Sequence, residues 1–135
     1  MNFLSSDRIR TGLLKREIIL NPPASEAQIQ LLADRIGEIH PYTISIYKSF
    51  NGFRNEDFDA KSEIEIWSIE KILESNNRYF SDDVFPFCSL SLDAMIFVAS
   101  GKDPRKPVVS YFDNAILSPS LLEFWDSFLS GRFDV

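Results

Sequence analysis

The chain has 135 residues, of which 44% are hydrophobic and 25% are charged. This length suits one domain that buries a core without metal or disulfide staples, and the composition excludes a disordered chain. The net charge of −6 repels nucleic acid on average, so we expect no direct nucleic-acid partner and favour a basic protein as the partner instead.

The first residues mix charged side chains with short apolar pairs, and residues 1–20 are predicted to be a flexible arm ahead of a domain over residues 21–135. The first expected helix begins at a capping box, in which the Ser25 hydroxyl and the Gln28 side chain satisfy the first turn. An apolar stripe at helical spacing follows over residues 29–36. Gly37 then supplies the left-handed residue that ends many helices.

A second helix is expected to begin at Pro41, because the first helical position needs no N–H donor. It is expected to stop at Asn51-Gly52. Asparagine and glycine take positive φ more readily than other residues, so this pair predicts a helix C-cap followed by a turn. A catalytic amide is the alternative, but the neighbouring sequence offers no nucleophile, base or set of metal ligands.

The middle of the chain predicts strands. Residues 63–67 alternate polar with apolar side chains, and Ser68 can cap a short helix over residues 69–75. Further strands are expected at 85–89, 94–99 and 107–113. A last helix should open at Ser118-Pro119 and bury Leu121, Leu122, Trp125, Phe128 and Leu129. The predicted fold is α+β: a single domain with a central, mainly antiparallel sheet flanked by N-terminal and C-terminal helices.

Side chains that carry chemistry are few. His40 stands alone in a bend without neighbouring carboxylates or cysteines, so it forms neither a triad nor a zinc site. Cys88 has apolar neighbours and no adjacent base, which indicates a buried thiol in a reducing compartment. The common nucleotide-binding and metalloprotease motifs do not occur. We therefore expect no catalytic residue, metal or cofactor.

No apolar run approaches the roughly 20 residues of a membrane helix. We expect a cytoplasmic protein that does not contact membranes.

The charge is concentrated in one part of the sequence. Residues 55–93 contain ten acidic and three basic residues, a net charge of −7, while the rest of the chain sums to +1. Such a run is commonly a solvated face. It can also be a docking surface, with Phe53, Phe58 and Trp67 as candidate aromatic anchors among the acids.

Eight short stretches follow one another in a recognisable order between residues 23 and 128. They are PASEAQI (23–29), IG (36–37), FNG (50–52), IEIWSIEKI (64–72), FPF (85–87), DAMIFV (93–98), PVV (107–109) and LEFWDSF (122–128). In this order they resemble the SUKH superfamily, which comprises the fungal Smi/Knr-type cell-wall regulators and their bacterial relatives. The chain departs from the family pattern in two places. His40 precedes Pro41 where the family usually has leucine, and the glycines that are common in the central strands of the family are missing between Asp93 and Ser100.

The resemblance implies an α+β fold without catalytic residues, used widely as an immunity protein that neutralises a toxin, often a nuclease. We therefore expect a non-enzymatic protein that binds a cognate bacterial toxin domain through its acidic middle segment. The expected contacts are Phe53, Glu56, Asp57, Phe58, Asp59, Glu63, Glu65, Asp82 and Asp83. A regulatory or scaffolding interaction domain unrelated to a toxin is the alternative, and a small hydrolase with a carboxylate pair is the third.

Overall fold

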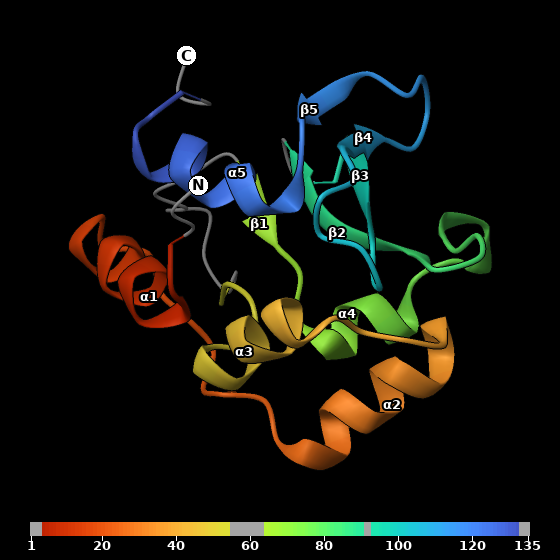
Figure 1. Cartoon of the computed structure of the whole chain (residues 1–135), viewed down its shortest axis with the longest axis horizontal. Helices are drawn as coiled ribbons and strands as arrows, with labels where there is room; N and C mark the ends of the chain where they lie inside the picture. Colours follow the sequence, from red (N-terminus) through yellow and green to blue (C-terminus); the bar gives the residue numbers. More distant parts are fainter. Residues whose placement is uncertain (1–3, 55–63, 91–92, 133–135) are drawn as a thin grey trace.

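The computed structural model describes residues 4–54, 64–90 and 93–132, and Figure 1 shows helices gathered around a curled sheet. This confirms the expected α+β single domain. The elements are α1 (Ser6–Lys15), α2 (Glu26–Ile36), α3 (Pro41–Ser49), β1 (Ile64–Ile66), α4 (Ile69–Glu74), the 3-10 turn η1 (Asn77–Tyr79), β2 (Val84–Leu90), β3 (Met95–Ser100), β4 (Val108–Ser110), β5 (Ile116–Ser118) and α5 (Leu121–Leu129).

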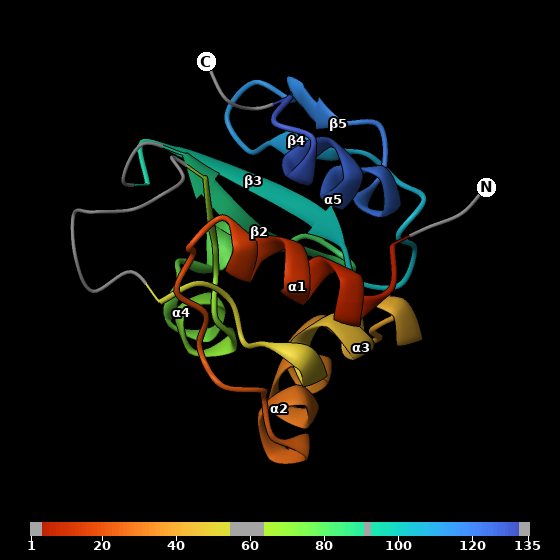
Figure 2. The same ribbon diagram turned by 90° about the vertical axis from the view of Figure 1, so that its left-hand side faces the viewer.

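The sheet is a meander in which the described strands lie in sequence order, each antiparallel to the next. β2 and β3 are the longest strands and run across the molecule in Figure 2. A register shift between Pro86 and Cys88 lets the intervening Phe87 bulge out of the ladder. The expected antiparallel arrangement is confirmed.

The core is centred on α5. Trp125 and Phe124 are fully buried and meet the ring of Phe87 edge-to-face, with centroid distances of 6.0 and 5.3 Å. Phe50, which follows α3, meets Trp125 in the same manner at 5.9 Å. Each such side chain stabilises the fold by roughly 3 kcal/mol through burial. These rings join the last helix to the sheet and to the N-terminal half of the chain.

Residues 1–20 are not a loose arm where the structure describes them. α1 has Ser5 as its N-cap, and its Ile9 and Leu13 are fully buried. The helix contacts both α3 and α5, and Arg16 donates from Nη1 to the Phe128 carbonyl at 2.6 Å. The expectation of a flexible arm is therefore wrong for α1, which belongs to the domain.

Most helix ends follow their sequence signals. The Ser25–Gln28 capping box is present, Gly37 has φ 98°, and Ser68 accepts from the third N–H of α4. α3 begins at Pro41 as expected but ends at Ser49, two residues before Asn51, with Phe50 as its C-cap. In the C-terminal part, the expected strand over 107–113 is present only as the short β4, with a turn after it, and β5 is a further strand that was not expected from the sequence.

Candidate functional site

The acids of the expected docking segment lie in different places in the fold. Glu65 is on β1 and pairs with Ser89 near the end of β2, whereas Asp82 and Asp83 stand just before β2 begins. Six residues of strand separate position 83 from position 89, a distance of about 20 Å. The described acids therefore do not form one continuous surface.

Five of the expected contact residues cannot be placed. Glu56, Asp57, Phe58, Asp59 and Glu63 lie in the segment 55–63, outside the described residues. Their role in binding stays a prediction.

Glu65 belongs to a polar cluster at the β1 end of the sheet. The Lys71 ammonium lies 3.1 Å from a Glu65 oxygen and 3.0 Å from an Asp93 oxygen, so one cation serves two carboxylates. Ser89 donates to Asp93 at 2.5 Å and accepts from Trp67 Nε1 at 2.8 Å. The Asp93 side chain is 44% exposed and that of Glu65 only 15%. A partner docking here would therefore meet Asp93 before Glu65.

Two of the aromatic side chains considered as anchors are buried. Phe53 is 7% exposed, and its ring meets that of Phe128 at 5.9 Å. Trp67 is 3% exposed, with its indole N–H bonded inside the protein and the Lys71 ammonium 4.8 Å from its ring. The expectation that either ring is exposed is wrong, because Phe53 packs against Phe128 of α5, and Trp67 is bonded to Ser89 of β2 and lies beneath Lys71.

The second acidic place lies at the start of β2. Asp82 is exposed and has φ 52°. Asp83 accepts a hydrogen bond from the Ser100 hydroxyl, which lowers the pKa of the Asp83 carboxyl, with smaller contributions from Lys102 and Lys106 against the opposing effect of burial. Asp83 therefore keeps its negative charge well into acid solution.

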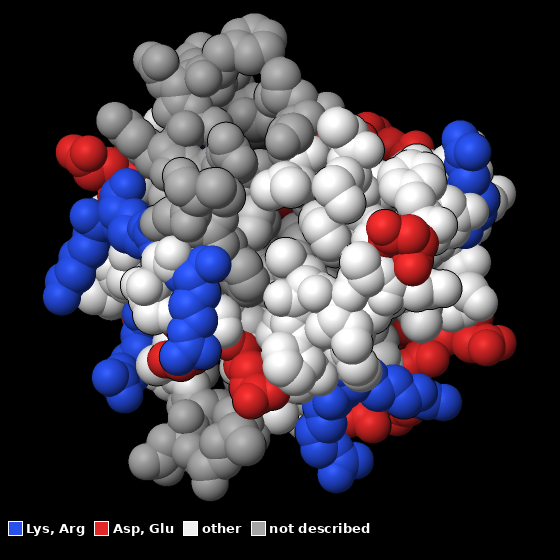
Figure 3. All heavy atoms as spheres, turned by 90° about the horizontal axis from the view of Figure 1, so that it is seen from above, with Lys and Arg blue, Asp and Glu red and all other residues white. Residues whose placement is uncertain are grey.

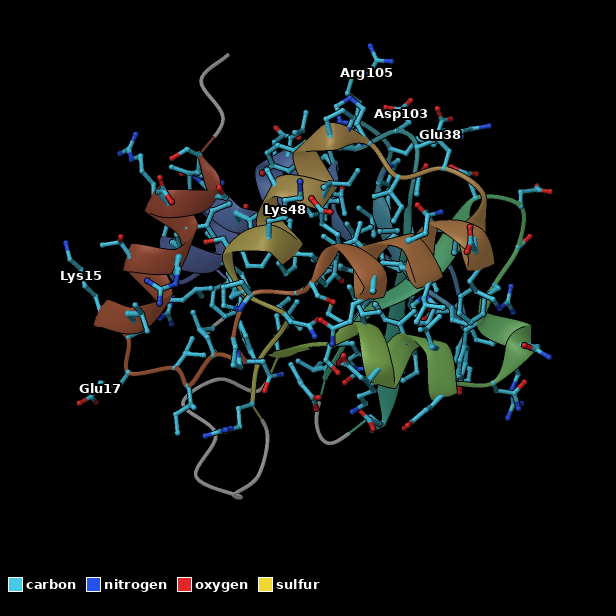
Figure 4. All side chains as sticks on the ribbon, turned by 90° about the horizontal axis from the view of Figure 1, so that it is seen from below. Lys15, Glu17, Glu38, Lys48, Asp103 and Arg105 are labelled. Atoms are coloured by element: carbon cyan, nitrogen blue, oxygen red, sulfur yellow. The ribbon has the colours of Figure 1, made fainter. Side chains whose placement is uncertain are left out.

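Basic groups lie close to this second place. The loop after β3 carries Lys102, Arg105 and Lys106, and the Arg105 side chain bonds Asp103 at 3.1 Å. That contact lowers the pKa of Asp103. Figure 4 shows Arg105, Asp103 and Glu38 at one side of the molecule and Lys15 at another. The surface near Asp83 is thus of mixed charge, whereas the cluster described at the β1 end has two carboxylates that share one ammonium group.

The two side chains considered for chemistry have structural tasks. His40 is the N-cap of α3, and its Nδ1 accepts from the Tyr42 N–H at 3.0 Å. Cys88 is fully buried, and this burial raises the pKa of its thiol. Neither side chain is arranged as a nucleophile or base, and among the described residues no group of three His, Cys, Asp or Glu side chains could hold a metal ion.

Asn51 connects α3 to α4, a role that the sequence does not predict. Its amide oxygen accepts from the Ile69 N–H at 2.9 Å, and its amide nitrogen donates to the Glu70 carboxylate at 2.9 Å. Asn51 is only 5% exposed, so it joins the end of α3 to the start of α4 inside the protein. The Asn-Gly pair does not predict this contact, because the Ile69 partner in α4 lies eighteen residues further along the chain.

Gly52 is a second part of the same connection. It has φ 74°, and a Cβ atom there would lie 2.6 Å from the Ser68 nitrogen and 2.8 Å from the Ile66 carbonyl oxygen. Only glycine fits both the backbone conformation and the space.

No model of a known protein family matches the chain, and no curated protein matches its sequence. Within the described residues, none of the helices has the length and apolar character needed to cross a membrane.

Proposed function

We propose that the chain is a cytoplasmic, non-enzymatic immunity protein of the SUKH type that binds and neutralises a cognate bacterial toxin domain. The proposed partner is a protein with a basic surface, with nuclease domains as the first class to test. No cofactor, nucleic acid or membrane takes part in this function.

One observation carries the proposal: two separate stretches that resemble the SUKH superfamily meet in space. Asn51 and Gly52 of the FNG stretch contact Ser68, Ile69 and Glu70 of the IEIWSIEKI stretch through side-chain bonds and close backbone approach. Because these residues contact one another, a change in one stretch affects the packing of the other, and the two stretches together help to specify the fold. This supports the resemblance as one of structure, and with it the function that the resemblance implies.

The charge distribution supports a basic partner. A nuclease must hold phosphates with Lys and Arg, so carboxylates on an inhibitor can occupy the same groups and speed the encounter at low salt. Among the described acids of residues 55–93, those that are exposed and therefore accessible to such a partner are Glu70, Glu74, Asp82 and Asp93. His40, Cys88 and Asn51 already serve the fold, which is consistent with a binding role rather than catalysis.

The first experiment measures binding to the toxin domain encoded beside this protein, by calorimetry over a salt series. We expect tight binding that weakens as salt rises, because salt screens charged contacts. The absence of binding to a correctly folded neighbouring domain would refute the immunity function.

Charge-neutral variants then locate the surface. Asp57→Asn with Asp59→Asn tests the segment before β1, and Asp82→Asn tests the start of β2 while keeping a residue that tolerates its positive φ. Asp126 is an exposed residue of α5, and Asp126→Asn removes one negative charge at a third place. It is therefore the matched control for Asp82→Asn, whereas the double variant removes two charges. We expect the first variant to slow association roughly tenfold and the control to leave it within about twofold. Equal effects per charge removed at all three places would show that only net charge matters and would refute a defined acidic site.

A further inference from the structure

β5 forms an unpaired edge of the sheet. Within the part of the chain that the structure describes, β5 pairs with β4 on one side and with no strand on the other. Two large apolar side chains are strongly exposed beside this edge: Phe112 at 60% and Ile116 at 65%. Figure 3 shows the molecule from above, with a broad area in which few acidic or basic side chains lie and with most of the charged groups around it. β5 has three residues, and its register with β4 shifts at Leu117, between the pairs Val108–Ser118 and Val109–Ile116. Short and bulged edges pair less readily than long flat ones, so the exposed apolar side chains must supply much of the contact at this edge.

We propose that β5 pairs with β5 of a second copy of this chain, antiparallel and around a two-fold axis near Leu117. The two sheets then continue across the axis, and Ile116 and Phe112 of each copy leave water. A two-fold interface requires a surface that is complementary to itself. The charges at the two ends of β5 meet this requirement.

An acidic group marks one end of β5 and basic groups mark the other. Asp113 lies in the turn that leads into β5, and its carboxylate accepts from the Ala115 N–H at 3.0 Å. Val108 pairs with Ser118, so the residues just before β4, Arg105 and Lys106, lie toward the far end of β5. Both basic side chains and Asp113 are exposed.

Antiparallel pairing brings opposite ends of the two strands together. Asp113 of each copy then approaches the basic pair of the other, and the contact occurs twice because of the two-fold axis. Parallel pairing would instead set like charges against each other. The charge pattern therefore favours a second copy in antiparallel orientation over an unrelated strand.

The proposed dimer lies away from the opposite edge of the sheet, where the Phe53 N–H donates to the Ile66 carbonyl. That edge is β1, with Glu65 and the nearby Lys71 and Asp93, so a dimer presents this polar cluster twice. The inference does not depend on the toxin-binding proposal, and either can fail alone.

Sedimentation equilibrium of the full chain over a range of protein concentrations tests the proposal. We expect wild type to form dimers reversibly. Ile116→Lys places a charge in the interface of both copies, so the dimer dissociation constant should rise at least about a hundredfold. Leu31→Lys is the matched control: Leu31 is 56% exposed on α2, and its substitution should leave the dissociation constant unchanged.

A double-mutant cycle tests the orientation. Asp113→Asn removes a charge but keeps an oxygen for the Ala115 N–H, and Lys106→Gln removes the opposing charge. Each should weaken the dimer several-fold at low salt, and the double variant should weaken it by less than the product of the two effects. A monomeric wild type would overturn the proposal and leave the edge to a strand of another protein. An unchanged dimer in Ile116→Lys, or independent effects in the cycle, would overturn it as well.

Discussion

Replacing Asn51 with alanine should destabilise the protein far more than a change at a helix end normally does. The substitution removes the acceptor of the Ile69 N–H and the donor to Glu70, both at 2.9 Å. Glu70 is exposed and can exchange the lost bond for water, but the bond at Ile69 is buried. The two losses therefore differ in size.

The expected cost follows from this difference. A hydrogen bond to a group that water can reach contributes about 1 kcal/mol, and leaving a buried N–H without a partner costs about 2 kcal/mol more. Asn51→Ala should thus lower the free energy of unfolding by about 3 kcal/mol. For a domain of this size the melting temperature should fall by roughly 10 °C.

Urea denaturation followed by circular dichroism measures this change, with Glu70→Ala as the matched variant. Glu70→Ala removes the exposed half of the connection, together with the hydrogen bond that Glu70 accepts from Gln28 Nε2, and should cost about 1 kcal/mol. If Asn51→Ala costs less than about 1 kcal/mol, or no more than Glu70→Ala, the buried bond to Ile69 is not what joins α3 to α4.

Three further changes test the fold and its titrating groups. Gly52→Ala should prevent stable folding or cost more than about 3 kcal/mol, since the new Cβ would meet backbone atoms at 2.6 Å and φ is 74°; expression and thermal melting measure this. Cys88 should stay unreactive toward a thiol reagent in the native protein and react after unfolding, because it is fully buried and its pKa is raised; fast native labelling would contradict this. Ser100→Ala should lower the free energy of unfolding above about pH 4, where the Asp83 carboxylate is charged in both the folded and the unfolded state. The difference from wild type should shrink as the pH falls through the lowered pKa of Asp83 in the folded state, and denaturation at several pH values measures it.

Local signals predicted most helices correctly because their causes are local. The capping box at Ser25, the proline that begins α3 and the left-handed Gly37 all act within a few residues of the chain. α1 carries the same kind of signal, with Ser5 as a cap and Ile9 and Leu13 four residues apart. The expectation of a flexible arm over residues 1–20 overlooked this helix, although its local pattern indicates one.

β5 could not be read in the same way. Asn114 has φ 60°, and the turn around it separates β4 from β5, which lies beyond the expected strand over 107–113. A three-residue strand has too short a pattern to be recognised alone, and it exists because Val109 pairs with Ile116. Its position depends on the rest of the sheet.

The candidate site was predictable only as a list of residues. The run of acids in the sequence gave their number, but Glu65 and Asp83 come to lie near opposite ends of β2. The burial of Phe53 depends on Phe128, which lies 75 residues further along the chain in α5. Such partners are set by tertiary packing, which linear charge and hydrophobicity do not contain.

The contact between α1 and α5 also sets an order of events during synthesis. The two residues joined by the Arg16 bond are 112 positions apart, so α1 leaves the ribosome long before the helix it packs against. Until then α3 is the earlier partner of α1, and the face of α1 that belongs against α5, where Gly12 lies beside the Leu129 side chain, stays open to chaperones and proteases. Closing so distant a contact is slow compared with forming either helix. The nascent chain therefore completes its core only after translation has passed α5, and a ribosome that stalls earlier holds a partly folded, protease-sensitive chain.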